Sequence, residues 1–249
     1  MKLGKLPPRH DPRTLIFGDY FARRKHLPPS PPVRDWNDKL GPDLGMMKND
    51  EAGDCGFAGL GHAIMTWSSE HGNLYTPSDT EVLGWYSECT GYVPGDPSTD
   101  NGVVLLDALT YFRKKGLIFA FMKVDHHSFD HLQTAINLFG GVYIGASLPV
   151  SAQDTSRPWH GTTGSLEGDA AVGSWGGHCM WAAKYARPAA SAFNVDFSTW
   201  GKRQPADAQW WLDYVDECYA ILSPRWADTA LPAPSGFDLA TLRADLSAL

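Results

Sequence analysis

Hydrophobic residues recur at helical spacing through the first half of this chain. In residues 55–67, Phe57, Leu60, Ile64 and Trp67 fall on one face of a helix. A second apolar stripe and three glycines indicate that this helix is packed on most sides. Two further helices are predicted in this half, at residues 76–89 and 105–115.

Short apolar runs replace this spacing in the second half and indicate strands. The predicted strands cover residues 117–124, 141–148, 178–185 and 193–200. Helices are predicted at residues 129–139, 205–222 and 239–249, and a long loop rich in Gly, Ser and Thr at residues 151–175. A helical half followed by a mainly antiparallel β half predicts an α+β fold.

The pattern also predicts the domain organisation. Residues 1–35 are rich in proline and basic residues, and they are expected to form an extended arm rather than a helix. Residues 36–249 are predicted to form a single domain. Its helical half spans about 36–116, its β-rich half about 117–222, and its C-terminal tail 223–249.

The composition of the 249 residues narrows the class of protein. A hydrophobic content of 43% fits a packed core, and a net charge of −7 argues against a nucleic-acid partner, which needs a basic face. No apolar stretch is long enough to span a bilayer, and the N-terminus lacks the apolar core of a signal peptide. We therefore expect no membrane partner and a cytoplasmic or virion-associated location.

The cysteine and histidine patterns do not predict a metal site. The four cysteines have no CxxC pair, which favours reduced thiols; they are Cys55, Cys89, Cys179 and Cys218. The His-rich run at residues 125–131 is interpreted as a solvated turn before a helix, with Ser128 or Asp130 as its cap. We expect no metal and no organic cofactor.

Cys55 is the strongest candidate for a reactive residue. It follows Gly53-Asp54, where a loop ends and the first predicted helix begins. Free backbone N–H groups and the positive end of the helix dipole stabilise a thiolate at such a position. The alternative is a small buried residue, since free cysteine is among the most buried residue types. The adjacent Asp54 counts against reactivity, because a negative charge raises a thiol pKa.

Two later motifs complete a pattern with Cys55. Gly176-Gly177-His178 opens a predicted strand, and Phe197-Ser198-Thr199-Trp200-Gly201 follows it. This order of parts resembles the papain-like cysteine peptidases over about residues 27–222, and the chain looks like a divergent bacterial or phage-type member. The resemblance implies a cleft between the two halves, with Cys55 as nucleophile and His178 as general base and acid.

Two supporting positions depart from the family pattern. Alignment on Trp200-Gly201 puts Ser198 where the family has the asparagine that orients the histidine, with Asp196 on the same strand face as the alternative. Asn49, six residues before Cys55, replaces the glutamine that helps to hold the oxyanion. Trp200 is expected to shield the histidine from water, as the matching tryptophan does in the family.

The resemblance predicts a hydrolase that cleaves amide bonds of a peptide or protein substrate through an acyl-thioester. Two alternatives stay open. A cell-wall peptide amidase or acyl transferase would use the same Cys-His dyad on another substrate. A non-catalytic papain-like module would have a structural or binding role in a larger assembly, and the two substituted supporting positions keep this alternative open. The arm is too short for the family's folded propeptide, so another form of control is expected, and whether the arm occupies the cleft stays open.

Overall fold

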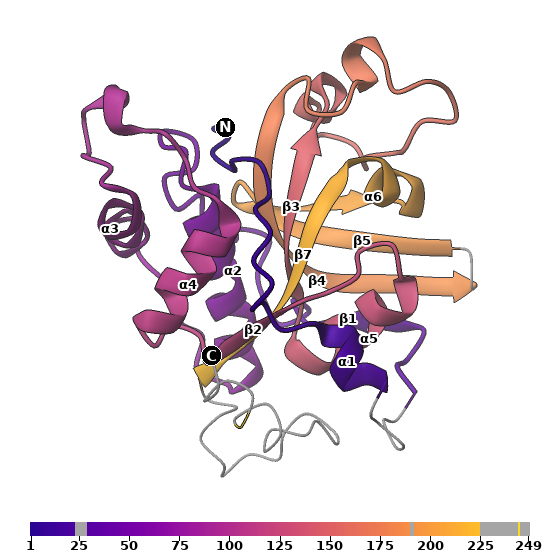
Figure 1. The fold of residues 1–249 in the computed structure, drawn as a ribbon. Coiled ribbons are helices and arrows are strands. Elements are labelled where there is room, and N and C mark those ends of the chain that lie inside the picture. Colours follow the sequence, from indigo (N-terminus) through magenta and orange to yellow (C-terminus); the bar gives the residue numbers. More distant parts are fainter. Residues whose placement is uncertain (23–28, 190–191, 225–243, 245–249) are drawn as a thin grey trace.

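The computed structural model describes residues 1–22, 29–189, 192–224 and 244. The helices between residues 55 and 114 lie to one side, and the N-terminal segment runs between them and an antiparallel sheet, which carries the other helices (Figure 1). The described helices are α1 (Phe17–Ala22), α2 (Cys55–Glu70), α3 (Asp79–Thr90), α4 (Leu105–Lys114), α5 (Phe129–Phe139) and α6 (Ala208–Tyr214). Short 3₁₀ turns are η1 (Pro97–Thr99), η2 (Val150–Gln153) and η3 (Gly168–Ala170).

The strands form one antiparallel sheet in the order β2-β7-β3-β4-β5-β6, with β1 paired to β4. They are β1 (Val33–Asp35), β2 (Ala120–Lys123), β3 (Val142–Leu148), β4 (Gly176–Ala189), β5 (Ala192–Thr199), β6 (Lys202–Ala206) and β7 (Val215–Leu222). The molecule has two hydrophobic clusters, one on each face of the sheet, and β3 contributes to both of them. Successive residues of β3 belong to different clusters, because side chains alternate across a strand. Ile144 packs with α5 and α6, whereas Tyr143 packs with α2 and α4.

Helix α2 lies close to the sheet because glycines face it. A Cβ on Gly59 would lie 3.1 Å from the Tyr143 ring and 3.2 Å from Cys179 Sγ. The Tyr143 hydroxyl also donates to the carbonyl oxygen of Gly56 over 2.7 Å. These contacts fix the first turn of α2, which carries Cys55, against β3 and β4.

The predicted α+β fold is confirmed, but helices and strands lie in both halves. The helix predicted at residues 205–222 was wrong, because this segment holds the end of β6, then α6 and β7. Nearly every residue of β7 is buried, and the short apolar run at residues 218–222 does not distinguish a strand from a buried helix. The helix predicted at residues 239–249 falls almost wholly outside the described residues.

The arm at residues 1–35 is not extended throughout, since it contains α1 and β1. Phe17 of α1 is buried, and its ring lies 6.2 Å from that of Phe139 on α5. The carbonyl oxygen of Leu15 accepts the N–H of Lys123 over 2.8 Å. The apolar side of α1 therefore anchors the second part of the arm to α5 and β2.

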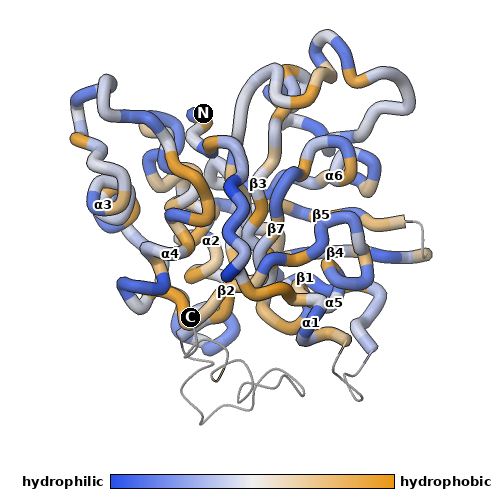
Figure 2. The backbone as a smooth tube through the Cα atoms, viewed as in Figure 1, coloured by the Kyte–Doolittle hydropathy of each residue, from blue (hydrophilic) through white to orange (hydrophobic). Residues whose placement is uncertain are grey.

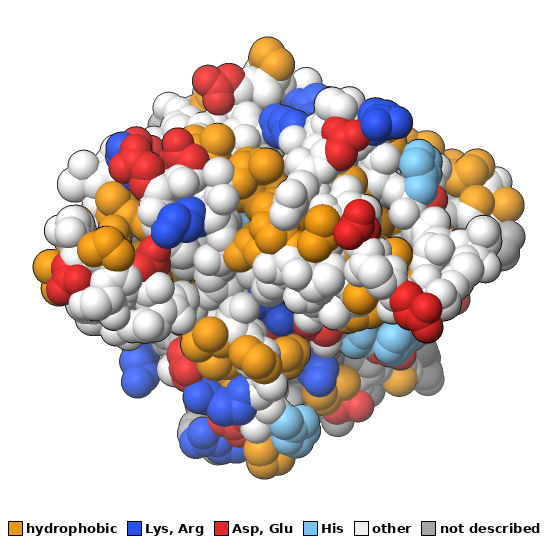
Figure 3. All heavy atoms as spheres, turned by 90° about the horizontal axis from the view of Figure 1, so that it is seen from above, with side chains coloured by type: hydrophobic (Ala, Val, Ile, Leu, Met, Phe, Trp, Pro, Cys, Tyr) orange, Lys and Arg blue, Asp and Glu red, His pale blue; other side chains and the backbone are white. Residues whose placement is uncertain are grey.

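Seen from the end at which the chain begins, hydrophobic side chains gather along the middle of the molecule with charged groups to both sides (Figure 3). Within the described ranges, none of the helices has the length and apolar character needed to cross a membrane.

Ser128 and Asp130 were the two predicted caps of the helix at residues 129–139. The structure has Ser128 as the cap of α5, since its side chain accepts the N–H of His131.

Candidate active site

Cys55 is the first residue of α2, and 1% of it is exposed. Its thiol lies near backbone groups of Cys179 on β4 and Gly4 of the arm, which oppose the rise of its pKa. Because Cys179 directly follows His178, the thiol of Cys55 on α2 lies next to the strand that carries the histidine. The structure thus brings the two proposed catalytic segments together.

His178 lies at the start of β4 and is fully buried. Its Nε2 lies 2.7 Å from Oγ1 of Thr199. The ring of Trp200 stacks on the imidazole, with centroids 4.1 Å apart and planes 14° apart. Among the described residues, Nδ1 has no hydrogen-bond partner. In the tautomer in which Nε2 donates to Thr199, Nδ1 keeps its lone pair and can act as a base.

The partner predicted for the histidine is corrected by this geometry. Ser198 Oγ instead accepts from Nδ2 of Asn37 over 2.9 Å, and Asp196 pairs with Lys184 over 2.8 Å. Thr199 is the last residue of β5 and directly precedes Trp200, and its side chain faces the imidazole. Ser198 points to the opposite face, because successive strand residues alternate. The sequence could have indicated Thr199 as the partner of His178, because Thr199 carries a hydroxyl and directly precedes Trp200.

Asn49 is buried in the loop before α2, with its amide turned into that loop. Nδ2 donates to the carbonyl oxygen of Ala52 over 3.2 Å and to Oδ1 of Asp54 over 3.1 Å. The oxyanion role predicted for Asn49 therefore requires the loop to rearrange. The N–H of Cys55 lies at the helix start, where backbone donors have no partner within the helix.

The first residues of the arm lie between the two walls of this site (Figures 1 and 2). On the helical wall, Val103 donates its N–H to Gly4 over 2.7 Å and accepts from Leu6 over 2.9 Å. On the sheet wall, Lys5 donates its N–H to the carbonyl oxygen of Gly177 over 3.1 Å. The arm is therefore held as an extended peptide, and Gly177 directly precedes His178.

Glycines allow this close fit. A Cβ on Gly4 would lie 1.8 Å from the carbonyl oxygen of Gly53, and a Cβ on Gly177 would lie 2.1 Å from that of Lys5. Gly53 and Gly177 belong to opposite walls. A side chain at Gly4 or Gly177 would therefore exclude the arm from its present position.

Burial favours the neutral forms of both candidate catalytic side chains. Burial raises the pKa of the Cys55 thiol to about 12 and lowers the pKa of the His178 imidazole to about 3. The backbone groups of Cys179 and Gly4 oppose the shift of the thiol but are outweighed by desolvation. The thiolate expected at this helix start is therefore not favoured while the arm is seated.

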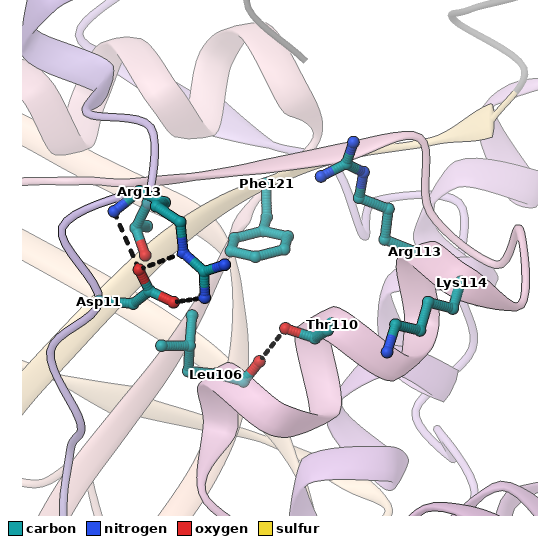
Figure 4. A pocket seen from close by; sticks show the side chains of 8 residues that line it. Asp11, Arg13, Leu106, Thr110, Arg113, Lys114 and Phe121 are labelled. Atoms are coloured by element: carbon teal, nitrogen blue, oxygen red, sulfur yellow. Dashed lines mark hydrogen bonds and ion pairs between the residues drawn. The ribbon is translucent and has the colours of Figure 1, made fainter. Parts of the chain in front are cut away.

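Farther along the arm, a pocket of about 350 Å³ opens between the arm, α4 and β2 (Figure 4). Asp11 and Arg13 pair with each other on the arm side, with Nε of Arg13 3.0 Å from Oδ1 of Asp11. Phe121 lines the pocket from β2, and Leu106 and Thr110 line it from α4. These residues are separate from the Cys55 site.

Within the described ranges, no group of three or more Cys, His, Asp or Glu residues is arranged to hold a metal ion.

Comparison with solved structures identifies the papain-like fold. Xylellain, a cysteine protease from Xylella fastidiosa, matches with a TM-score of 0.62 and 16% identity, over 89% of this chain and 96% of its own. Digestive procathepsin L 3 of the Tenebrio molitor larval midgut matches with a TM-score of 0.57 and 9% identity, over 80% of this chain and 72% of its own. No protein-family model and no curated protein matches the chain. The predicted papain-like fold is thus confirmed.

Proposed function

We propose that this protein is a papain-like cysteine peptidase whose N-terminal arm occupies the cleft and keeps the enzyme latent. One observation carries the proposal. The arm backbone is hydrogen-bonded as an extended peptide between the loop and helices around Cys55 and the strand of His178. A cleft that holds one peptide in this way is suited to hold another.

The geometry supports a mechanism for a substrate that replaces the arm. Nδ1 of His178 takes the thiol proton while Sγ of Cys55 attacks the amide carbonyl. The N–H of Cys55 and the positive end of the α2 dipole stabilise the oxyanion. His178 then protonates the leaving amine, and a water activated by the same imidazole hydrolyses the thioester. Thr199 and Trp200 keep the ring oriented throughout.

The test uses the full chain with Gly4→Ala, since a Cβ at this position overlaps Gly53 and displaces the arm. Gly41→Ala is the matched control, because nothing lies within 4 Å of a Cβ there. The measurement is the rate at which iodoacetamide alkylates Cys55 across pH, assigned by peptide mass mapping. The partly exposed Cys89 serves as an internal reference in every sample.

We expect slow labelling of Cys55 in the wild type and in Gly41→Ala. In Gly4→Ala we expect fast labelling below neutral pH, which is lost when His178→Ala is added, together with cleavage of peptide substrates. Trypsin cleavage after Lys5, whose side chain is buried while the arm is seated, reports independently that the arm has left the cleft. A trypsin-sensitive arm combined with an ordinary thiol profile at Cys55 would contradict the proposal and favour the non-catalytic module.

A further inference from the structure

Lys5 of the arm is buried in an acidic pocket beside the proposed catalytic pair. Its side chain is 1% exposed, and Nζ lies 2.9 Å from Oδ2 of Asp216 and 3.6 Å from Oε1 of Glu217. Glu217 is itself 1% exposed. Its other oxygen, Oε2, accepts from the Tyr219 hydroxyl over 2.9 Å. The pocket is therefore built from charged and polar groups that the proposed reaction does not use.

A β-bulge aims two consecutive carboxylates into this pocket. Opposite β3, Gly145 pairs with Glu217 while the next residue, Ala146, pairs with Val215, so Asp216 is the extra residue on β7. In a regular strand, Asp216 and Glu217 would point to opposite faces. The bulge locally redirects the strand, and both side chains meet one ammonium group.

Gly145 provides the room for a long side chain. A Cβ at this position would lie 2.2 Å from Cε of Lys5 and 2.7 Å from Cγ of Glu217. Ser147, on the same face of β3, donates to Oδ2 of Asp216 over 2.6 Å and holds that carboxylate in place. The pocket thus has space for the aliphatic stem and fixed acceptors for the charged end.

The pocket is tied to the cleft through the backbone of the arm. The N–H of Lys5 donates to the carbonyl oxygen of Gly177, beside His178, and the backbone of the preceding residue, Gly4, lies near the thiol of Cys55. A peptide side chain that enters the pocket therefore belongs to a residue at or next to the position facing the thiol. When the arm leaves, the buried Glu217 loses its nearest cation, and an uncompensated buried charge is costly.

We propose that the pocket formed by Gly145, Ser147, Asp216 and Glu217 selects substrates with a lysine or arginine side chain close to the scissile bond. This inference rests on the proposed peptidase function and specifies its substrate class. An apolar side chain of the same length would fill the space but would leave both carboxylates without a counterion. Lys5 acts as an internal copy of the preferred substrate side chain.

The test measures binding separately from turnover. The probes are two synthetic decapeptides with the sequence of residues 1–10, one with Lys5 and one with norleucine at that position. Each is titrated against full-length Gly4→Ala protein, and protection of Cys55 from iodoacetamide is recorded. We expect the lysine peptide to protect at a concentration about tenfold to a hundredfold lower. In Glu217→Gln, added to the same background, this ratio is expected to approach one.

Turnover is followed with alanine-rich quenched-fluorescence peptides that carry lysine or norleucine at each position in turn. Asp216→Asn serves as a second pocket variant, because its side chain is 26% exposed and tolerates change if Glu217→Gln does not fold. Equal protection by the two decapeptides would overturn the pocket proposal. Cleavage without a lysine preference would overturn it while supporting the peptidase. Lysine-dependent protection without cleavage would support the pocket and contradict the peptidase.

Discussion

Nε2 of His178 and Oγ1 of Thr199 lie 2.7 Å apart, and the ring of Trp200 covers the imidazole from one side. The hydrogen bond fixes the ring's direction, and the stacking fixes its plane. Thr199 thus orients the imidazole, and for the proposed peptidase we infer that it is a positioning residue, because its bond to Nε2 leaves Nδ1 without a hydrogen-bond partner among the described residues. This arrangement makes Thr199, rather than its neighbour Ser198, the residue to test.

In the Gly4→Ala background, Thr199→Val should lower kcat/KM about tenfold to a hundredfold, because a methyl group cannot hold the imidazole. It should also change the pH profile of Cys55 labelling. Thr199→Ser should restore both, since it returns the hydroxyl. Ser198→Ala is the matched control and should leave kcat/KM per folded molecule within about twofold, because Ser198 bonds to Asn37. A larger effect at Ser198 than at Thr199 would refute this assignment.

Stability should fall as the pH rises from neutral, owing to Asp54. Burial raises its pKa to about 8, above the value of about 3.9 in an unfolded chain. Between these values the folded state binds more protons than the unfolded state, so the free energy of unfolding decreases with pH. We expect a loss of about 2 kcal/mol between pH 6.5 and 8, measured by urea unfolding.

Asp54→Asn should flatten this dependence, whereas Asp50→Asn, at an exposed position in the same loop, should not. His62 and His178 act in the opposite direction at lower pH, because burial lowers their pKa values to about 4 and about 3. Because the folded state keeps both imidazoles neutral, the free energy of unfolding decreases as the pH falls below about 6.5, where the unfolded chain takes up protons on these histidines. A wild-type slope that Asp54→Asn leaves unchanged above that pH would exclude Asp54 as its source.

Gly177→Ala should separate access of a small reagent from access of a peptide. Its Cβ would lie 2.1 Å from the carbonyl oxygen of Lys5, so the arm should leave and iodoacetamide should reach Cys55. A substrate that runs along the same wall meets the same obstacle. We therefore expect labelling close to that of Gly4→Ala but kcat/KM lower by about tenfold or more. Equal peptide turnover in the two variants would place the substrate elsewhere.

Lys5→Met should unseat the arm without any change in the cleft. Loss of the ammonium leaves Glu217 and Asp216 without their counterion, so Cys55 labelling should rise by about tenfold or more over the wild type. Lys5→Arg keeps the charge and should stay closer to the wild type. Labelling in Lys5→Met that equals the wild-type rate would show that the backbone hydrogen bonds are enough to hold the arm.

The sequence predicted those parts of the molecule that local patterns determine. The predicted helix at residues 129–139 matches α5 (Phe129–Phe139), and α2 begins at Cys55 as its loop-to-helix motif indicated. Strand β7 was missed, because a buried central strand and a buried helix carry the same apolar signal. Thr199 was missed because the end of β5 sets which residue faces the histidine. The pairing of Lys5 with Glu217 joins residues far apart in the chain, and it depends on a bulge that no local pattern reveals.

The anchoring of α1 makes the arm a tethered ligand. Leu15 is fixed to Lys123, so residues 1–6 stay near the cleft even after they leave it, at an effective concentration of about millimolar for a short linker. For the proposed latent peptidase, we therefore expect that dilution does not cause activation and that a free competitor must reach a comparable concentration. A single cut between the cleft segment and α1 would change this, because the released peptide would dissociate on dilution.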